Sequence, residues 1–325
     1  MANNNENKVL NVPHLRFPEF NGEWEKCKIS DLLDFYSTNS LSWEQLEYDT
    51  NAMMNLHYGL IHVGLPTMID LAKDKLPNIK EGNMPKNFEM CKEGDVAFAD
   101  ASEDTNEVAK TVEFFKLAGK NVVCGLHTIH GRDNKHKTIV GFKGYAFLSA
   151  AFHNQIRRIA QGTKIYSIST KNFSECYIGL PSKPEQTKIA TLLRLIDERI
   201  ATQNKIIEKL QSLIKGLSQQ LLSSENDWIL YRLDDLAQIK SGYSGTQVSY
   251  QTPYKVSRIE TISKHCIDIQ RIGYVECIPE SYRLNVGNIL FSNINSIQYI
   301  GNTAYLDKDY GLYHGMNLLL SLIHI

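Results

Sequence analysis

Residues 181–222 read PSKPEQTKIATLLRLIDERIATQNKIIEKLQSLIKGLSQQLL, and this stretch decides the fold. Ser182 favours an N-cap, Pro184 suits the first turn, and Glu185 lies three residues after the cap, which together predict a helix start. Beyond this start, ten positions recur at alternating spacings of four and three residues, and nine of them are apolar. These positions are Ile189, Leu193, Ile196, Ile200, Gln203, Ile207, Leu210, Ile214, Leu217 and Leu221.

Such an alternation is typical of the seam of a coiled coil, where one helix packs along another. A helix over residues 185–222 would be about 57 Å long at 1.5 Å per residue, too long for the interior of one small domain. The sequence therefore predicts a spacer helix with a partner-binding seam, in which the polar Gln203 fixes the register. The alternative interpretation is a helix that packs on the core of its own domain.

The chain resembles itself on either side of this helix. Residues 21–32, which contain NGEW and ISDL, return as residues 225–236, which contain ENDW and LDDL. Residues 93–100, EGDVAFAD, return as residues 286–293, VGNILFSN. Two matches in the same order at similar offsets indicate a tandem duplication.

The repeats mix short β-like runs with polar loops and helical stretches, which predicts an α/β (α+β) fold class. We expect an N-terminal segment at 1–20, a first domain at 21–181, the long coiled-coil-type helix at 182–223, and a second, incomplete domain at 224–325. The order of the strands does not follow from the sequence.

The composition is that of a globular protein with about two domains, at 325 residues, 42% hydrophobic and 22% charged. No apolar run of about 18 residues and no signal-peptide pattern occurs, so we expect a cytoplasmic protein without a membrane segment. The six cysteines form no C-x-x-C pair, which favours reduced thiols. Cys124, His127 and His130 lie close in sequence, but without further ligands their spacing predicts no metal site.

Positive charge is unevenly distributed along the chain. The formal net charge is −1, yet between His127 and Phe173 eight lysines and arginines stand against Asp133 alone. A segregated field of this kind steers a polyanion onto one region, while the alternative is a solvated basic surface without a ligand. Within it, residues 157–164, RRIAQGTK, combine three cations, a glycine and a hydroxyl, which suits contact with a phosphate backbone. A basic helix that ends in a glycine cap before a strand fits the same letters.

The sequence holds no motif for a self-contained nucleotide-dependent enzyme. It has no phosphate-binding loop, dinucleotide fingerprint, zinc-protease helix or serine-hydrolase elbow. It also lacks the Asn/Asp-Pro-Pro-Tyr/Phe tetrapeptide with which methyltransferases hold a flipped base. We therefore expect no cofactor, and neither ATP hydrolysis nor methyl transfer by this chain alone.

Several of these segments together resemble the specificity subunit of type I restriction-modification systems. They are PHLRFPEF at 13–20 with Trp24, GDVAFAD at 94–100, the Gly162-Thr163 step, and GLPSKPEQ at 179–186 followed by Ile189-Ala190, Leu193 and Ile196-Asp197. The last segment is similar to the family's signature at the entrance to its conserved helix. The resemblance covers residues 13 to about 317.

The resemblance implies two target-recognition domains held apart by two long antiparallel helices, each domain reading one half of a split double-stranded DNA sequence. Methylation subunits would bind along the helical region, and a restriction subunit would join through them. The seam on the 185–222 helix would contact the partner helix and the methylation subunit. From charge and position, the residues expected to contact DNA are Arg132, Lys135, Lys137, Lys143, Arg157, Arg158, Thr163 and Lys164.

The sequence departs from the family pattern at its end, LLLSLIHI, where a second Leu-Pro…Glu-Gln signature and second helix would follow. With no second helix to cover the seam, we expect either a homodimer through residues 185–222 or poor solubility without a methylation subunit. Such a dimer would read a split palindrome. The alternatives to a specificity subunit are a self-contained nuclease or methyltransferase, a coiled-coil scaffold, or an inactive remnant without DNA binding.

Overall fold

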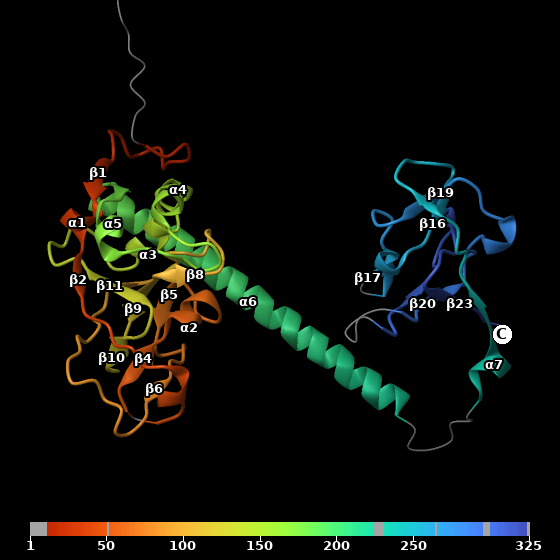
Figure 1. The fold of residues 1–325 in the computed structure, drawn as a ribbon, viewed down its shortest axis with the longest axis horizontal. Helices are drawn as coiled ribbons and strands as arrows, with labels where there is room; N and C mark the ends of the chain where they lie inside the picture. Colours follow the sequence, from red (N-terminus) through yellow and green to blue (C-terminus); the bar gives the residue numbers. More distant parts are fainter. Residues whose placement is uncertain (1–11, 51, 224–230, 264, 295–299, 324–325) are drawn as a thin grey trace, which may run out of the picture. The chain divides into compact units, whose positions relative to one another are not determined.

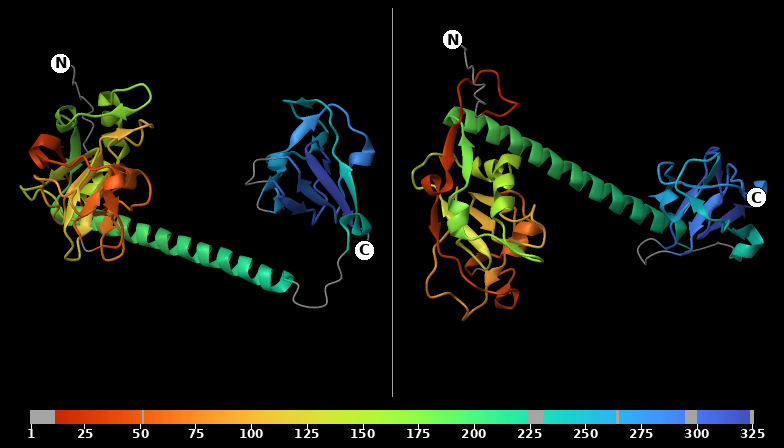
Figure 2. Two further views of the ribbon diagram at one scale, coloured as in Figure 1. Left: turned by 60° about the horizontal axis from the view of Figure 1, so that its bottom comes forward. Right: turned by 45° about the horizontal axis from the view of Figure 1, so that its top comes forward.

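The computed structural model describes residues 12–50, 52–223, 231–263, 265–294 and 300–323. Its contacts divide the chain into two compact units, residues 1–216 and 217–325 (Figures 1 and 2). Each unit mixes strands with short helices, and one long helix, α6 (Lys183–Leu222), links them in sequence. The predicted fold class is confirmed, whereas the domain boundaries at 20, 181 and 223 stay predictions.

The first unit is built on a five-stranded sheet with the order β2-β11-β7-β9-β5. Its strands are β2 (Asp34–Tyr36), β5 (Met68–Asp70), β7 (Val96–Ala99), β9 (Thr111–Lys116) and β11 (Thr128–Arg132). All four residues of β7 are buried, because both faces of the sheet are covered. On one face lie α3 (Lys143–Phe147), α4 (Ala150–Ile159) and α5 (Thr170–Ser174), whose phenylalanines pack around Phe98.

A second sheet covers the other face, with the order β10-β4-β6-β3. Its strands are β3 (Leu46–Glu47), β4 (Met54–Leu56), β6 (Asn78–Ile79) and β10 (Val122–Cys124). Leu56 and Val122 from this sheet share one core with Ala97, Ala99 and Phe114 of the first sheet. Alternate residues of β7 thus face the helices and the second sheet, as the two-residue period of a strand requires.

Short elements complete the first unit and bring its two ends together. Strand β1 (Glu25–Lys28) pairs with β13 (Tyr177–Leu180), and β8 (Ala101–Ser102) pairs with β12 (Tyr166–Ser167), both in antiparallel register. The remaining helices are α1 (Ile29–Leu32) and α2 (Tyr58–His62). Because β13 directly precedes α6, the start of the long helix is fixed to the N-terminal strand of the unit.

The second unit holds two four-stranded sheets, with the orders β14-β23-β20-β21 and β15-β19-β16-β22, and the pair β17–β18. Its elements are α7 (Leu233–Leu236), β14 (Ala237–Ser241), β15 (Gln247–Val248), β16 (Tyr254–Val256), β17 (Ile262–Ser263), β18 (Cys266–Ile267), β19 (Gly273–Val275), β20 (Ile289–Ser292), β21 (Thr303–Tyr305), β22 (Leu312–Tyr313) and β23 (Leu318–Ile323). Its core includes Leu290, Ala304 and Leu320.

The two units repeat one topology, which confirms the predicted duplication. Strands β14, β23, β20 and β21 stand in the same antiparallel order as β2, β11, β7 and β9. In the other sheets, the parallel pair β16–β22 matches the parallel pair β4–β10. The matched turn also recurs: Asp95 accepts a hydrogen bond from the Lys92 amide, and Asn288 accepts one from the Asn285 amide.

Among the described residues, no helix is both long and apolar enough to cross a membrane.

Candidate nucleic-acid interface

Helix α4 presents Arg157 and Arg158 in its last turn. The helix begins at Ser149, whose side chain accepts a hydrogen bond from the Phe152 amide, and it is fixed to the core through the buried Phe152 and Ile156. Both arginines are exposed on the opposite side. Arg157 donates a 2.7 Å hydrogen bond to Asn106, so its guanidinium is held in place without an acidic partner there. The end of α4 therefore offers two cations to the solvent.

The chain then makes a tight turn that exposes Thr163 and Lys164. Gln161 and Ser167 pair across the base of this turn, and an added Cβ at Gly162 would lie 1.9 Å from the Ile165 carbonyl oxygen. With a φ of +144° as well, position 162 requires glycine. The glycine thus allows the compact turn that presents a hydroxyl and an ammonium beside the end of α4.

Two further predicted residues lie on the segment after β11. Lys135 is exposed and donates to the Asp31 carbonyl oxygen at 3.0 Å. Lys137 lies 3.1 Å from a carboxylate oxygen of Glu25, and this hydrogen bond raises the pKa of Lys137. Lys135 thus remains available to an anion, whereas Lys137 is already paired at the surface.

Arg132 is buried and ion-paired inside the unit. Its guanidinium contacts Asp95 at 2.8 Å and Glu89 at 2.6 Å, and it donates to the Met90 carbonyl oxygen. Burial acts to raise the pKa of Asp95, but hydrogen bonds from His130 and Arg132 outweigh it and lower that pKa. Only 7% of Arg132 is exposed. Its charge is therefore balanced by acidic groups inside the unit.

Lys143 is buried in a second ion pair. Its Nζ lies 3.3 Å from Glu113, and the side chains are 3% and 0% exposed. The Glu113 carboxylate also accepts hydrogen bonds from the amides of Gly141 and Gly144, each at 2.8 Å. Burial raises the pKa of Glu113. Lys143 and Arg132 are buried and paired with acidic groups, so they are not among the DNA contacts proposed below. The sequence alone could not show these buried partners.

Four of the predicted residues lie close together in the chain. Arg157, Arg158, Thr163 and Lys164 lie within eight consecutive positions, and all four are exposed. Lys171, at the start of α5, is exposed as well. This group, Arg157 to Lys164, is the candidate interface of the first unit.

The predicted seam lies along α6 and is exposed over most of its length. The first seam residues, Ile189 and Leu193, are partly buried near the helix start. From there on the side chains are open: Ile196 is 45% exposed, Leu210 is 53% exposed and Leu221 is 73% exposed. The other exposed seam residues are Ile200, Gln203, Ile207, Ile214 and Leu217.

Sequence reasoning did not find the contacts that fix the start of α6. Glu185 accepts a bidentate pair of hydrogen bonds from Arg16, at 2.7 and 2.8 Å, and a third from the Trp24 indole. The bonds from Arg16 lower the pKa of Glu185. The Gln186 amide accepts from the Ile139 amide and donates to two carbonyl oxygens. The Pro-Glu-Gln motif was visible in the sequence, but its partners lie up to 169 residues away.

Comparison with known proteins identifies the family of the central segment. Residues 116–212 match the model of the type I restriction modification DNA specificity domain. This segment contains the candidate interface and most of α6.

Relatives and solved structures agree with this match. A type I restriction enzyme MjaX specificity subunit of Methanocaldococcus jannaschii is 46% identical over 100 residues, which cover 29% of this chain and 24% of the relative. The MjaVIII specificity subunit of the same organism is 28% identical over 145 residues, 38% of this chain and 32% of the relative. The matched segments thus span a quarter to a third of the curated relatives.

At the level of fold, the crystal structure of the type I restriction-modification S subunit from M. genitalium superposes with a TM-score of 0.53 at 17% identity, covering 93% of this chain and 73% of that one. The resemblance predicted from the sequence is confirmed: residues 116–212 match a type I restriction modification DNA specificity domain, and the chain has the fold of a type I specificity subunit.

Proposed function

We propose that this chain is the DNA sequence-specificity subunit of a type I restriction-modification complex, and that it directs methylation and restriction subunits to a split double-stranded target. The specificity-domain match over residues 116–212 carries the proposal. The candidate interface and most of the long helix fall within the match. None of the comparisons favours the coiled-coil scaffold or the inactive remnant.

In the first unit, the proposed DNA contacts are Arg157, Arg158, Thr163 and Lys164, with Lys135 as a further cation. The exposed cations suit phosphate contacts, which position a protein on a duplex without reading its bases. The tight turn at Gly162 lets backbone and hydroxyl approach the DNA closely. Of the three other cations that the sequence suggested, Arg132 and Lys143 pair with buried acidic groups, and Lys137 pairs with Glu25 at the surface.

The proposal is tested by the salt dependence of DNA binding. Replacing Arg157, Arg158 and Lys164 together by alanine should weaken binding and reduce the slope of log K against log salt by up to about 2.7, at ~0.9 for each phosphate contact. The matched control replaces three exposed lysines of α6, Lys205, Lys209 and Lys215, which removes the same charge elsewhere. Fluorescence anisotropy at several salt concentrations measures both. Equal slopes for the two triple variants would refute the proposed contact surface.

The exposed seam on α6 is the proposed surface for protein partners, either a methylation subunit or a second copy of this chain. An apolar strip of this length in water favours association. The double variant Ile196→Asp, Leu210→Asp should abolish self-association in light scattering and co-purification with the methylation subunit. Exposed Thr202 and Gln211 replaced by aspartate give a control with equal charge at positions off the seam. The seam would be excluded as the contact if the wild type were monomeric and the seam variant still co-purified with the methylation subunit.

We further propose that the chain acts without catalysis of its own. Purified protein incubated with DNA, magnesium, ATP and S-adenosylmethionine should neither methylate nor cleave the DNA, nor hydrolyse ATP. Addition of the methylation subunit should produce sequence-specific methylation, detected by methylome sequencing. Activity of the chain alone would show that it belongs to the class of self-contained enzymes.

A further inference from the structure

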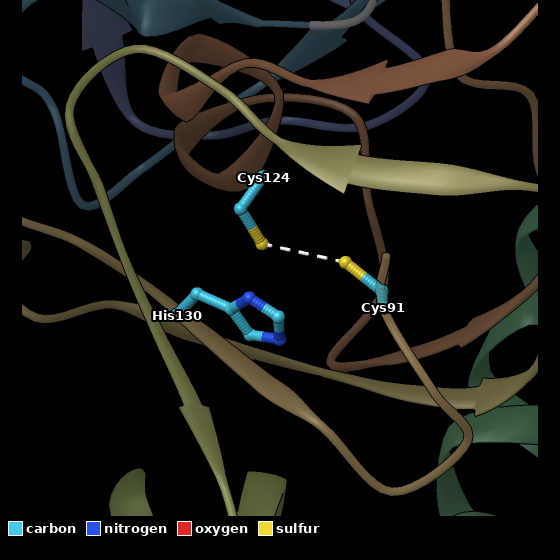
Figure 3. A group of neighbouring side chains, drawn as sticks. All are labelled: Cys91, Cys124 and His130. Carbon is cyan, nitrogen blue, oxygen red and sulfur yellow. Dashed lines mark hydrogen bonds between the residues drawn. The ribbon is translucent and has the colours of Figure 1, made fainter. Parts of the chain in front are cut away.

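Three buried side chains of the first unit bring metal-binding atoms together, although they are far apart in the sequence. The Sγ atoms of Cys91 and Cys124 are 3.6 Å apart, and both sulfurs and a ring nitrogen of His130 lie within 4.8 Å of one another. The three residues are 5%, 1% and 0% exposed. Figure 3 shows the imidazole of His130 directed toward the two sulfur atoms.

The protonation of His130 is fixed by its neighbour. Its Nε2 lies 2.7 Å from a carboxylate oxygen of Asp95, which Arg132 also holds. Because a carboxylate can only accept here, Nε2 carries a proton, and in the neutral imidazole Nδ1 keeps a free lone pair. Among the described residues, Nδ1 has no hydrogen-bond partner, although it is buried. A buried nitrogen without a partner destabilises the protein, so Nδ1 is free to accept a ligand from outside the chain.

This arrangement is the one that metal-binding histidines adopt. A histidine that binds a metal through one nitrogen commonly donates the proton of the other to a carboxylate, which orients the ring. Two thiolates and an imidazole are ligands that suit zinc, at about 2.3 Å from sulfur and about 2.0 Å from nitrogen. Two sulfurs bound to one tetrahedral zinc ion lie about 3.8 Å apart, close to the observed separation of Cys91 and Cys124.

We propose that the first unit binds one zinc ion through Cys91 Sγ, Cys124 Sγ and His130 Nδ1, with a water molecule as the fourth ligand. Binding releases the two thiol protons to solvent and leaves the proton on Nε2 of His130 in place. Cys124 ends β10 in one sheet, His130 lies on β11 in the other, and Cys91 lies in the segment before β7. The ion therefore joins the two sheets of the unit.

The second unit provides an internal control for this site. The amide of Cys91 donates to the carbonyl oxygen at the start of β10, and the amide of Leu284 makes the same bond to β22. By the same register, His314 follows β22 where Cys124 ends β10, and Leu320 of β23 corresponds to His130. One histidine and two leucines cannot hold zinc in this way. The full chain is thus expected to bind one ion and not two.

The first experiment measures metal in the full-length wild-type protein. Protein purified from zinc-supplemented medium without chelators should contain about one zinc per chain by elemental mass spectrometry. After zinc removal, titration with Co²⁺ should give thiolate-to-cobalt absorption in the near ultraviolet that saturates at one equivalent. Protein with less than about a tenth of an equivalent of zinc and no cobalt band at saturation would overturn the proposal. A Cys91–Cys124 disulfide found by peptide mapping would overturn it as well.

Variants then assign the ligands. Cys91→Ser, Cys124→Ser and His130→Ala should each reduce bound zinc at least tenfold, whereas Cys27→Ser and Cys176→Ser, at buried cysteines outside the site, should retain it. If a ligand variant fails to fold by circular dichroism, alkylation of the wild type decides the matter. Zinc should protect Cys91 and Cys124 from iodoacetamide under mild denaturation, and a chelator should remove that protection. Equal labelling with and without zinc would contradict the assignment.

Discussion

Cys124 of the first unit and His314 of the second hold the same position on one duplicated backbone. Each directly precedes a glycine, and two residues after each glycine comes a residue with positive φ, His127 at 54° and Asn317 at 64°. Both turns lead into an interior strand of a sheet, β11 in the first unit and β23 in the second. The turn and the strands are thus common to the two units, whereas the side chain before the glycine differs, Cys124 in one and His314 in the other.

The interiors differ accordingly. In the first unit Asp95, Arg132 and His130 form a buried polar cluster beside two cysteines. In the second unit the core at this place contains Leu284 and Leu320, each at most 4% exposed. The comparison teaches that turns and apolar strands are enough to build this pair of sheets. The polar cluster of the first unit is therefore not required by the fold.

The largest expected effect comes from replacing Asp95 of the first unit by asparagine, the residue at the matching position 288 of the second unit. Asp95→Asn retains an acceptor for the Lys92 amide but leaves the buried guanidinium of Arg132 with one carboxylate less. We expect the first unit to lose about 3–5 kcal/mol, the usual cost of breaking a buried pair. Hydrogen–deuterium exchange with mass spectrometry, read in β7 and β20, reports each unit separately.

The reverse exchange, Asn288→Asp, should destabilise the second unit by about 1–3 kcal/mol, because the new buried charge has no arginine beside it. Protection in β7 should not change in that variant. If Asp95→Asn left the hydrogen–deuterium exchange of β7 unaltered, the polar cluster would contribute nothing to the stability of the first unit.

An effect smaller than that of Asp95→Asn should follow from acidification, and it should affect the second unit through His314. This side chain is 1% exposed, and burial lowers its pKa to about 4. The unfolded chain binds the proton near 6.5, so unfolding takes up a proton between these values. The second unit should lose stability as the pH falls from 6.5 to 4, by about 3 kcal/mol in total.

Above pH 6.5 the His314 group should add no pH dependence to the stability of the second unit. The variant His314→Gln has no titrating group at this position, so its dependence on pH between 6.5 and 4 should be correspondingly flatter. Urea unfolding at several pH values, with exchange in β20 and β22 as the readout, measures the difference. Parallel profiles of stability against pH for wild type and variant would contradict the claim that His314 causes this loss of stability.

The smallest expected effect concerns the turn that both units share. Gly94 and Gly287 have φ values of 87° and 90°. An alanine at 287 would meet no atom within 4 Å, so only backbone strain of about 1 kcal/mol is expected. An alanine at 94 would also approach Val140 at 3.1 Å. Gly94→Ala should therefore cost more than Gly287→Ala in thermal unfolding, and a reversed order would show that the turns are not equivalent.

The long helix and the duplication were predictable because both leave a local or repeated pattern in the sequence. The seam residues recur at fixed spacings, and the turns of the two units share their letters. The order of the strands was not predictable, because β7 lies between β11 and β9, which come from two other segments of the chain. No periodicity of one segment determines its neighbours in a sheet.

The candidate site was predicted only in part, for a similar reason. Counting charges treated Arg132 and Lys143 like Arg158, although the first two face Asp95 and Glu113, which lie at least 30 residues away in sequence. The cluster of Cys91, Cys124 and His130 was missed because one cysteine lies 33 residues before the other. Local spacing cannot indicate ligands that a fold brings together from three segments.

The contacts that join the N-terminal part of the first unit to β13 and the start of α6 have a consequence for its synthesis on the ribosome. Arg16 and β1 find their partners, Glu185 and β13, only after a further stretch of chain has been made, 169 residues in the case of Arg16 and Glu185. At ~5–20 residues per second, that wait lasts about 8–34 s. During this time Cys27 and the edge of β1 have no cover from β13. The nascent chain thus remains for this time in a state in which the first unit cannot yet close.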